Sequence, residues 1–290
     1  MTTEEGYNDF LNKLVTLYDR GEATNITDWV FENVTGLQRY ERRIHKDYEI
    51  KYVEEKLLAT HLQALLQHMP VQYVLHEAWF YKMKFFVNEH VLIPRPETEE
   101  LVSWVVRDIR GGLADYRFNE CRLLDIGTGS GCIAISAKTE IENVGVTAID
   151  VNDEVLLIAK RNAQALQAEV DFLKINFLDE GAWGILGKYD IVVSNPPYIP
   201  EMEKEKLSKH VAAFEPGIAL FVRDDDPFIF YEKIARFGQR HLKEGGRIFV
   251  EIHEGYSVET TKIFESCNYI TEARDDMYGK KRMIQARLVR

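Results

Sequence analysis

The first 75 or so residues place apolar side chains at helical spacing. Apolar positions recur three and four residues apart, as in Phe10, Leu11, Leu14, Leu17 and Tyr18, which is typical of one face of an amphipathic helix. The pattern predicts a small all-helical unit over residues 1–75. Two roles are open for it: a cap that stabilises the rest of the chain, or an exposed face that recognises a macromolecular partner.

From Val71 to Ile93 the helical spacing gives way to an alternating one. Large apolar residues, mostly aromatic or β-branched, occupy every second position, at Trp79, Tyr81, Met83, Phe85 and Val87. Such alternation indicates β-strands, and Asn88-Glu89 has the composition of a hairpin turn. The sequence therefore predicts a β-hairpin that links two domains across residues 76–96.

Beyond Pro96 the pattern becomes strand, helix, strand, helix. The expected strands are Arg122–Ile126, Val144–Ile149, Val170–Ile175, Asp190–Ser194, Arg247–Ile252, Tyr269–Ala273 and Met283–Leu288. The expected helices are Glu97–Ile109, Gly131–Lys138, Asp153–Leu166, Phe228–His241 and Ser257–Glu265. This order favours an α/β domain over residues 97–290, with a doubly wound seven-stranded sheet. The link from Asp275 to Arg282 is too short for a crossover helix, so the last strand is expected to run antiparallel.

The amino-acid composition excludes several classes of protein. A chain of 290 residues with 46% apolar content can bury a large core and divide into more than one domain. The formal charge of −11 is unfavourable for neutralising many phosphates, so no direct nucleic-acid partner is expected. No apolar window approaches a membrane span, and the acidic N-terminus resembles neither a secretory signal nor a basic transit peptide. Three scattered cysteines fit a reducing compartment. We expect a cytoplasmic protein without a membrane partner.

A glycine-rich turn follows the first strand of the predicted sheet. The run Gly127-Thr-Gly-Ser-Gly131 lets the backbone approach a nucleotide-like ligand at the N-terminus of the next helix. Asp150 ends the next strand about 20 residues later, where a carboxylate can accept both hydroxyls of a ribose. The alternative for Asp150 is an N-cap of the helix near Asp153, although Asn152 is the better cap candidate.

The third strand ends at Ile175-Asn176-Phe177. The amide of Asn176 and the ring of Phe177 can contact an adenine, or they can form a loop turn with a core phenylalanine. Because parallel strands end at one edge of a sheet, these side chains and Asp150 are expected at one ligand site. No histidine has metal-ligand spacing with cysteine or aspartate, so no metal site is predicted.

The fourth strand runs directly into Asn195-Pro196-Pro197-Tyr198. Proline neither donates to a strand ladder nor continues a helix, so the backbone carbonyls at this strand end are free to accept hydrogen bonds. Together with the amide oxygen of Asn195, they suit a planar NH2 group. The two motifs indicate a methyl donor that faces an amide or amine acceptor.

With these motifs the sequence resembles class I S-adenosylmethionine-dependent methyltransferases, specifically the protein glutamine N5-methyltransferases that modify peptide chain release factors. The matching segments are Gln72-Tyr73, Leu92-Ile-Pro-Arg-Pro-Glu-Thr-Glu99, Asp125–Gly131, Asp150, Ser194–Ile199, Glu215-Pro216, Ala219-Leu220 and Glu251-Ile252. The chain departs from the family pattern at His76, Val222-Arg223 and His253, and Phe177 stands where the family often has tryptophan.

The resemblance implies the reaction and its participants. S-adenosyl-L-methionine would donate its methyl group, leaving S-adenosyl-L-homocysteine, and the acceptor would be the glutamine of a Gly-Gly-Gln motif in release factors. The implied cofactor-binding residues are Gly127, Thr128, Gly129, Ser130, Gly131, Asp150, Asn176, Phe177 and Asn195.

The resemblance also implies how the acceptor is held. The Asn195 side-chain oxygen and the Pro196 carbonyl would accept from the two N–H bonds, Tyr198 would pack against the substrate, and Pro197 would complete the substrate site. Asp125 would shape the glycine turn or meet the cofactor's amino group. Arg95, Glu97 and Thr98 would close over the cofactor or cap a helix.

Three other functions compete with this interpretation. The acceptor could be a glutamine of a ribosomal protein, since the two activities share these motifs. A nucleic-acid base methyltransferase could use Asn195–Tyr198 on a flipped base, although the acidic charge disfavours it. A non-catalytic binding module is disfavoured by the presence of both Asn195 and Asp150.

Overall fold

The computed structural model describes residues 1–112, 121–207 and 209–289. These residues form two compact units, one of residues 1–77 with 208–214 and one of residues 78–207 with 215–290. Each unit has its own hydrophobic core.

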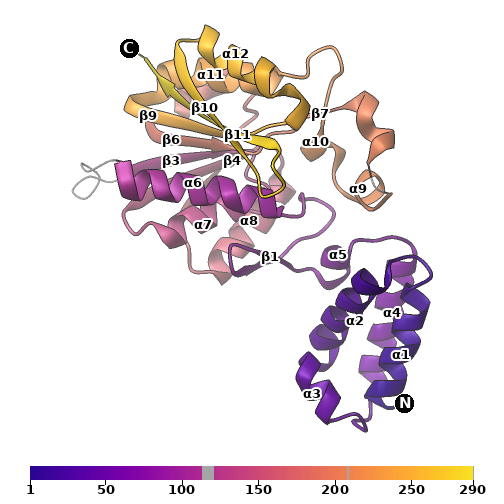
Figure 1. Cartoon of the computed structure of the whole chain (residues 1–290). Helices are drawn as coiled ribbons and strands as arrows, with labels where there is room; N and C mark the ends of the chain where they lie inside the picture. The colour runs from indigo at the N-terminus through magenta and orange to yellow at the C-terminus, as the bar shows by residue number, and fades with distance from the viewer. Residues whose placement is uncertain (113–120, 208, 290) are drawn as a thin grey trace. The chain divides into compact units, whose positions relative to one another are not determined.

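The N-terminal unit is helical, as predicted (Figure 1). Its helices are α1 Thr3–Leu14, α2 Arg20–Thr35, α3 Arg39–Ile44, α4 Tyr52–Leu66, α5 Val71–Leu75 and α9 Lys209–Phe214. Thr2 and Glu5 form a capping box at the start of α1, and Asp19 caps α2. Helices α1, α2 and α4 pack around Leu14, Val30 and Leu65, which are fully buried. The helical spacing of apolar residues in the sequence therefore marks the faces that bury this core.

The hairpin is present, but its turn lies elsewhere than predicted. Strand β1 (Ala78–Phe80) pairs antiparallel with β2 (Met83–Phe85), so the turn is Tyr81-Lys82 and not Asn88-Glu89. Tyr81 and Lys82 have φ of 49° and 63°, as a type I′ turn requires. The prediction was wrong because Asn is a frequent turn residue and Tyr-Lys is not. A tertiary hydrogen bond from the Tyr81 N–H to Glu99 Oε1 (2.9 Å) holds the unusual turn.

The second unit contains the predicted seven-stranded sheet. Its strand order is β10-β11-β9-β6-β3-β4-β5. Strand β11 pairs antiparallel with both of its neighbours, β10 and β9, and the other pairs of these described strands are parallel. The strands are β3 Cys121–Ile126, β4 Val144–Asp150, β5 Val170–Lys174, β6 Tyr189–Ser194, β9 Leu242–Glu251, β10 Tyr269–Asp275 and β11 Lys281–Leu288. A short parallel pair, β7 Ile199–Pro200 with β8 Phe221–Val222, follows the central strand β6.

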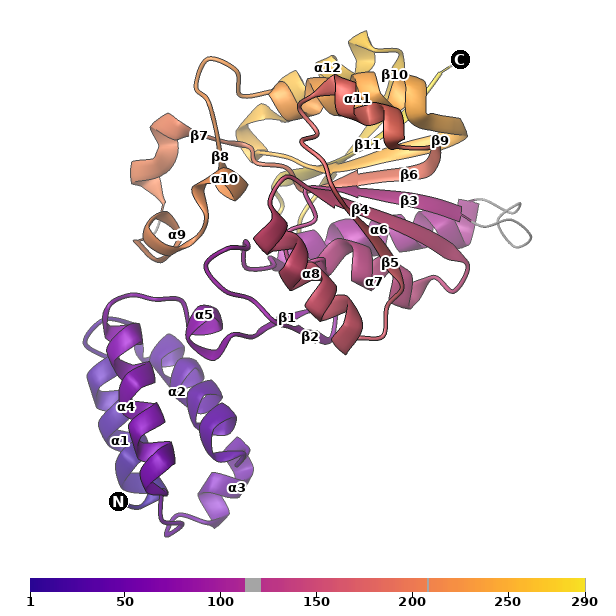
Figure 2. The same cartoon turned by 180° about the vertical axis from the view of Figure 1, so that it is seen from behind.

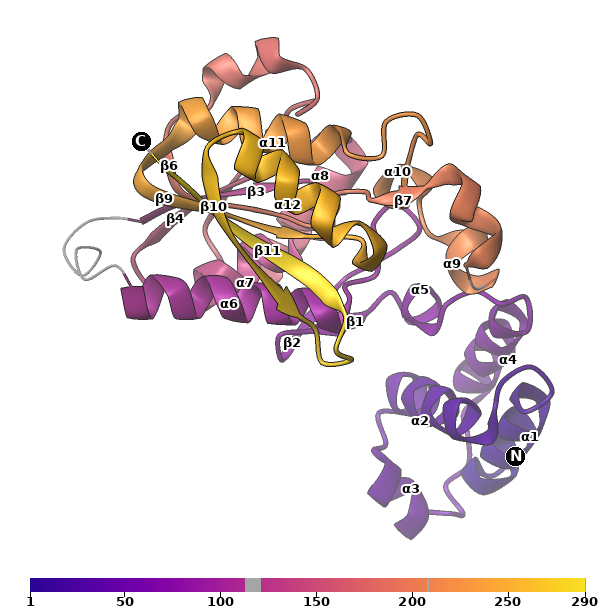
Figure 3. The same ribbon diagram turned by 45° about the horizontal axis from the view of Figure 1, so that its top comes forward.

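Helices cover both faces of this sheet (Figures 1, 2 and 3). The helices α6 Pro96–Gly112, α7 Cys132–Glu140 and α8 Asp153–Ala165 lie on one face, and α11 Ile229–His241 and α12 Ser257–Ser266 lie on the other. Short helical segments occur at η2 Glu180–Ile185, η3 Glu201–Lys206, α10 Gly217–Leu220 and η4 Glu254–Tyr256. No helix among the described residues is both long and apolar enough to cross a membrane.

The central strands are apolar on both faces because both faces are covered. Leu123 belongs to the core beneath α6 and α7, while the adjacent Leu124 belongs to the core beneath α11. Chain order reverses between β3 and β6, since β4 and β5 extend the sheet one way and β6 resumes on the other side of β3. Such a switch point opens a crevice at the carboxyl ends of the strands.

Gly238 on α11 offers a stability test of this packing. A Cβ at this position would collide with the Tyr269 hydroxyl and lie 2.7 Å from Ile248 Cδ1. We expect Gly238→Ala to lower the free energy of unfolding by about 1–3 kcal/mol in denaturant titrations, despite the better helix propensity of alanine. Gly184→Ala is the matched control, since its Cβ would meet nothing within 4 Å. Equal stability of the two variants would contradict this account of the α11 interface.

Candidate active site

A cavity of about 340 Å³ lies at the carboxyl ends of β3, β4, β5 and β6. Its wall brings together most of the residues that the sequence singles out: Gly127, Thr128, Gly129, Ser130, Asp150, Asn176, Phe177, Asn195, Pro196 and Pro197. Gly131 and Tyr198, which were also assigned to the cofactor or the substrate, are not part of this wall, and neither are Asp125 and Glu97. Gly131 starts α7 behind the glycine loop, and Tyr198 lies beyond the prolines with its hydroxyl on Glu251.

The glycine loop turns sharply beneath the cavity. Gly129 has φ of 56°, and a Cβ there would meet nothing within 4 Å, so its open side belongs to the cavity. Gly131 has φ of 83°, and a Cβ there would lie 2.9 Å from Ile135 Cδ1 and 3.3 Å from Ala159 Cβ. One glycine therefore keeps space open for a ligand, and the other permits close packing of α7 against α8.

Asp150 stands at the end of β4 and faces the cavity. Its Oδ2 accepts a hydrogen bond from the Gly129 N–H (3.2 Å), and its Oδ1 accepts from the Asn152 N–H (3.2 Å). Burial raises the pKa of this carboxyl, and the backbone N–H groups oppose the shift. An ionised carboxylate has about four lone-pair sites, so it can still accept from two further donors. Asn152 caps α8 by accepting from the Glu154 N–H (2.9 Å), as expected.

Asn176 and Phe177 form the part of the wall that follows β5. Asn176 Oδ1 accepts from the Leu178 N–H (3.2 Å) and so closes its own turn. The Phe177 ring is 5% exposed, stacks on Trp183 with centroids 5.4 Å apart and meets Phe237 edge-on. Phe177 is therefore a core residue, which was one of the two alternatives, and it also lines the cavity.

Asp125 lies under the glycine loop and is fully buried. Its Oδ2 accepts a hydrogen bond from the Thr128 hydroxyl (2.7 Å), which supports the loop from below. Burial raises the pKa of Asp125 to about 7, while the hydrogen bond from Thr128 works in the opposite direction. Of the two roles open for Asp125, this contact supports the shaping of the glycine turn.

The raised pKa of Asp125 predicts a pH-dependent stability. Below about pH 4 the group is protonated in both the folded and the unfolded chain, and its contribution to folding is fully present. As pH rises towards about 7, the unfolded chain ionises first, so the stability difference between wild type and Asp125→Asn should fall by a few kcal/mol and then level off. Urea titrations of both proteins from pH 4 to pH 8 measure this stability difference. The control is Asp171→Asn, a substitution at an exposed position. A difference that does not vary with pH would contradict the assigned shift.

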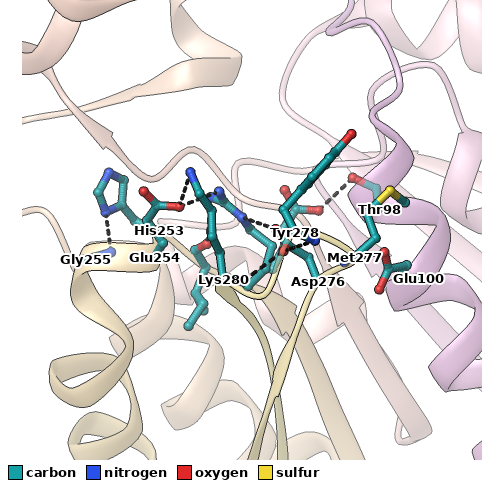
Figure 4. Close-up of polar contacts among 12 residues, drawn as sticks. Thr98, Glu100, His253, Glu254, Gly255, Asp276, Met277, Tyr278 and Lys280 are labelled. Carbon is teal, nitrogen blue, oxygen red and sulfur yellow. Dashed lines mark hydrogen bonds and ion pairs between the residues drawn. The ribbon is translucent and has the colours of Figure 1, made fainter.

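Asn195 and Tyr198 are held by a common buried carboxylate. Asn195 Nδ2 donates to Thr98 Oγ1 (3.1 Å), and Thr98 Oγ1 donates to Glu251 Oε2 (2.6 Å). The Tyr198 hydroxyl donates to Glu251 Oε1 (3.0 Å). Figure 4 draws the bond of Thr98 as a dashed line beside the turn between β10 and β11. Three segments far apart in the sequence therefore meet at the end of β6.

Glu251 is 1% exposed at the end of β9. Burial raises its pKa, whereas the hydrogen bonds from Thr98 and Tyr198 and the charge of Arg282 lower it. The Tyr231 hydroxyl donates to the backbone carbonyl of Glu251 (3.1 Å) and fixes the backbone there. Sequence reasoning assigned Glu251 no role. The available signal was a carboxylate that ends an apolar strand at the same sheet edge as Asp150 and Asn195.

The linker before α6 is attached to the same unit by a second buried carboxylate. Arg95 forms an ion pair with Glu215 (2.6 Å), and the Ile93 N–H donates to the other oxygen of Glu215 (3.3 Å). Arg95 lines the cavity, as does Thr98. Of the two roles open for these residues, this placement favours a wall of the ligand site.

The sheet order, the glycine loop and the cavity at the switch point agree with the class of protein that the comparisons give, the methyltransferases. Residues 114–213 match the family model of the "Methyltransferase small domain". A methyltransferase from Pyrococcus furiosus has a similar structure, with a TM-score of 0.50 and 17% identity over 79% of this chain and 98% of that one. At this identity the likeness shows the fold alone.

Sequence relatives give the particular family. A release factor glutamine methyltransferase from Flavobacterium psychrophilum is 36% identical over 277 residues, which is 95% of each chain. The relative of the same name from Bacteroides thetaiotaomicron is 36% identical over 94% of this chain and 95% of its own. The chain belongs to the release factor glutamine methyltransferase family.

Proposed function

We propose that this enzyme transfers a methyl group from S-adenosyl-L-methionine to the side-chain nitrogen of the glutamine in the Gly-Gly-Gln motif of peptide chain release factors. Its family membership supports the reaction and the substrate. The observation that carries the proposal is the juxtaposition of Asn195 and Pro196 with Asp150 and the glycine loop on one cavity wall.

The cavity residues fit S-adenosyl-L-methionine, which supplies an electrophilic methyl group on a sulfonium. Asp150 would accept the ribose hydroxyls, and the loop Gly127–Gly131 lets the backbone approach the ligand. Phe177 and Asn176 would contact the adenine. A volume of about 340 Å³ is within the usual range of small-molecule sites.

The acceptor nitrogen requires orientation more than activation. An amide nitrogen is a weak nucleophile because its lone pair is delocalised into the carbonyl. Asn195 Oδ1 and the Pro196 carbonyl would accept from its two N–H bonds, which fixes the plane of the amide and stabilises the positive charge that develops on nitrogen. Once methylated, the nitrogen is acidic and loses a proton, so no strong general base is needed.

The two units would have different functions in the reaction, one in methyl transfer and the other in substrate recognition. The cavity residues named above all belong to the unit of residues 78–207 and 215–290. We propose that residues 1–75 recognise the release factor and that residues 76–96 link this region to the methyltransferase domain. The reaction would take place in the cytoplasm, where release factors act.

Transfer of labelled methyl groups tests the proposal. The enzyme, S-adenosyl-L-methionine with a tritiated methyl group and a bacterial release factor should yield a labelled factor. Replacing the acceptor glutamine by alanine in the factor should abolish the label. A release factor that stays unlabelled, or a label that survives this replacement, would overturn the proposal. Labelling of ribosomal proteins instead would favour the sister activity.

A further inference from the structure

The acceptor site contains a hydrogen-bond chain with a defined direction. It runs from Asn195 through Thr98 to Glu251, and its two distances are 3.1 and 2.6 Å. Glu251 receives hydroxyl groups on both oxygens, from Thr98 and from Tyr198. Burial raises the pKa of this carboxyl, and the hydrogen bonds from the two hydroxyls and the positive charge of Arg282 oppose that shift.

The acceptor oxygen of Glu251 determines the direction of the Thr98 hydroxyl. A hydroxyl has a single hydrogen, and that of Thr98 is directed to Glu251. Towards Asn195 the Thr98 oxygen can then only accept. Asn195 must therefore present its NH2 group to Thr98, and its Oδ1 is left for a donor from the substrate.

The opposite orientation of the Asn195 amide would be unproductive. If the amide turned by 180°, its NH2 group would face the NH2 group of the incoming glutamine, and neither could accept. Asparagine by itself has little preference between the two orientations, because its oxygen and nitrogen are nearly equal in size. The preference has to come from a neighbour.

We propose that Thr98 is a positioning residue for methyl transfer: oriented by the buried Glu251, it fixes the Asn195 amide with its oxygen towards the acceptor nitrogen. Glu251 has a second positioning role, because the same carboxylate holds the Tyr198 hydroxyl. This inference rests on the proposed function. It adds two side chains that touch neither the methyl group nor the acceptor and that act through Asn195 and Tyr198.

Substitutions at position 98 separate a positioning role from a packing role. Thr98→Val keeps the shape and removes the hydroxyl, whereas Thr98→Ser keeps the hydroxyl and removes a methyl group. We expect Thr98→Val to lower kcat for release-factor methylation by about 10- to 100-fold, with little change in the Kd of S-adenosyl-L-homocysteine by calorimetry. Thr98→Ser should restore most of the activity. A role in packing alone would give the reverse order.

Thr260→Val is the matched control. Thr260 is also a fully buried threonine of this unit, and its hydroxyl has no hydrogen-bond partner among the described residues. Its kcat should equal that of wild type. Equal kcat for wild type and a folded Thr98→Val would overturn the inference while leaving the proposed function intact, whereas a wild-type enzyme that transfers no methyl group would overturn the function itself.

Glu251→Gln keeps the test decisive if Thr98→Val does not fold. Glutamine has one accepting oxygen in place of two, so either Thr98 or Tyr198 loses its acceptor. We expect kcat to fall about tenfold or more, with cofactor binding retained. If this variant folds and its kcat is unchanged, the hydrogen bonds from Asn195 through Thr98 to Glu251 have no positioning role.

Discussion

Asn195→Ala is expected to lower kcat by about 100- to 1,000-fold, which is the loss that follows removal of one aligned hydrogen-bonding group from a developing charge. The variant loses the oxygen that would fix the acceptor nitrogen, and the Pro196 carbonyl alone leaves the amide free to rotate. Cofactor affinity should change much less, because Asp150 and the glycine loop remain in place. Single-turnover rates with labelled cofactor measure the chemical step, and calorimetry measures the binding.

The exposed Asn143 provides the control for this variant. It belongs to the same unit but precedes β4 at the far end of the sheet from the cavity. Asn143→Ala should keep wild-type turnover. Full turnover by Asn195→Ala would exclude Asn195 from the acceptor site.

Asp150→Ala is expected to weaken cofactor binding by about 30- to 150-fold, corresponding to about 2–3 kcal/mol for the loss of charge-assisted hydrogen bonds to a ribose. The variant also removes the partner of the Gly129 N–H, so the loop loses a support. Calorimetric titration with S-adenosyl-L-homocysteine measures the Kd. Asp150→Asn should give an intermediate value, since an amide retains one accepting oxygen.

Asp153→Ala is the matched control for Asp150. Asp153 lies three residues later, is exposed and forms an ion pair with Lys174 at the surface. Its removal should leave cofactor affinity unchanged. Equal Kd values for the Asp150→Ala variant and wild type would show that the ribose is held elsewhere.

The sheet was predictable because local pattern and burial agree along its strands. Leu123 and Leu124 are both apolar, as a strand covered on its two faces requires, and each belongs to a different core. The antiparallel last strand followed from the short link between β10 and β11. The hairpin turn was mislocated because Tyr81 and Lys82 adopt positive φ under a tertiary contact with Glu99, which local sequence does not encode.

The cofactor-binding residues were easier to predict than the residues that hold Asn195 in place. Asp150 and the glycine loop carry a local signature of strand, turn and helix. The bond between Thr98 and Glu251 joins positions 153 residues apart, and no periodicity relates them. Only the folded sheet brings the start of α6 and the end of β9 to the same point as Asn195.

A crystal structure of the enzyme with S-adenosyl-L-homocysteine tests the central claim most directly. We expect the ribose hydroxyls within hydrogen-bond distance of Asp150, and the sulfur directed at the space between Asn195 Oδ1 and the Pro196 carbonyl. A nucleoside bound outside this cavity, or a sulfur turned away from Asn195, would contradict the account.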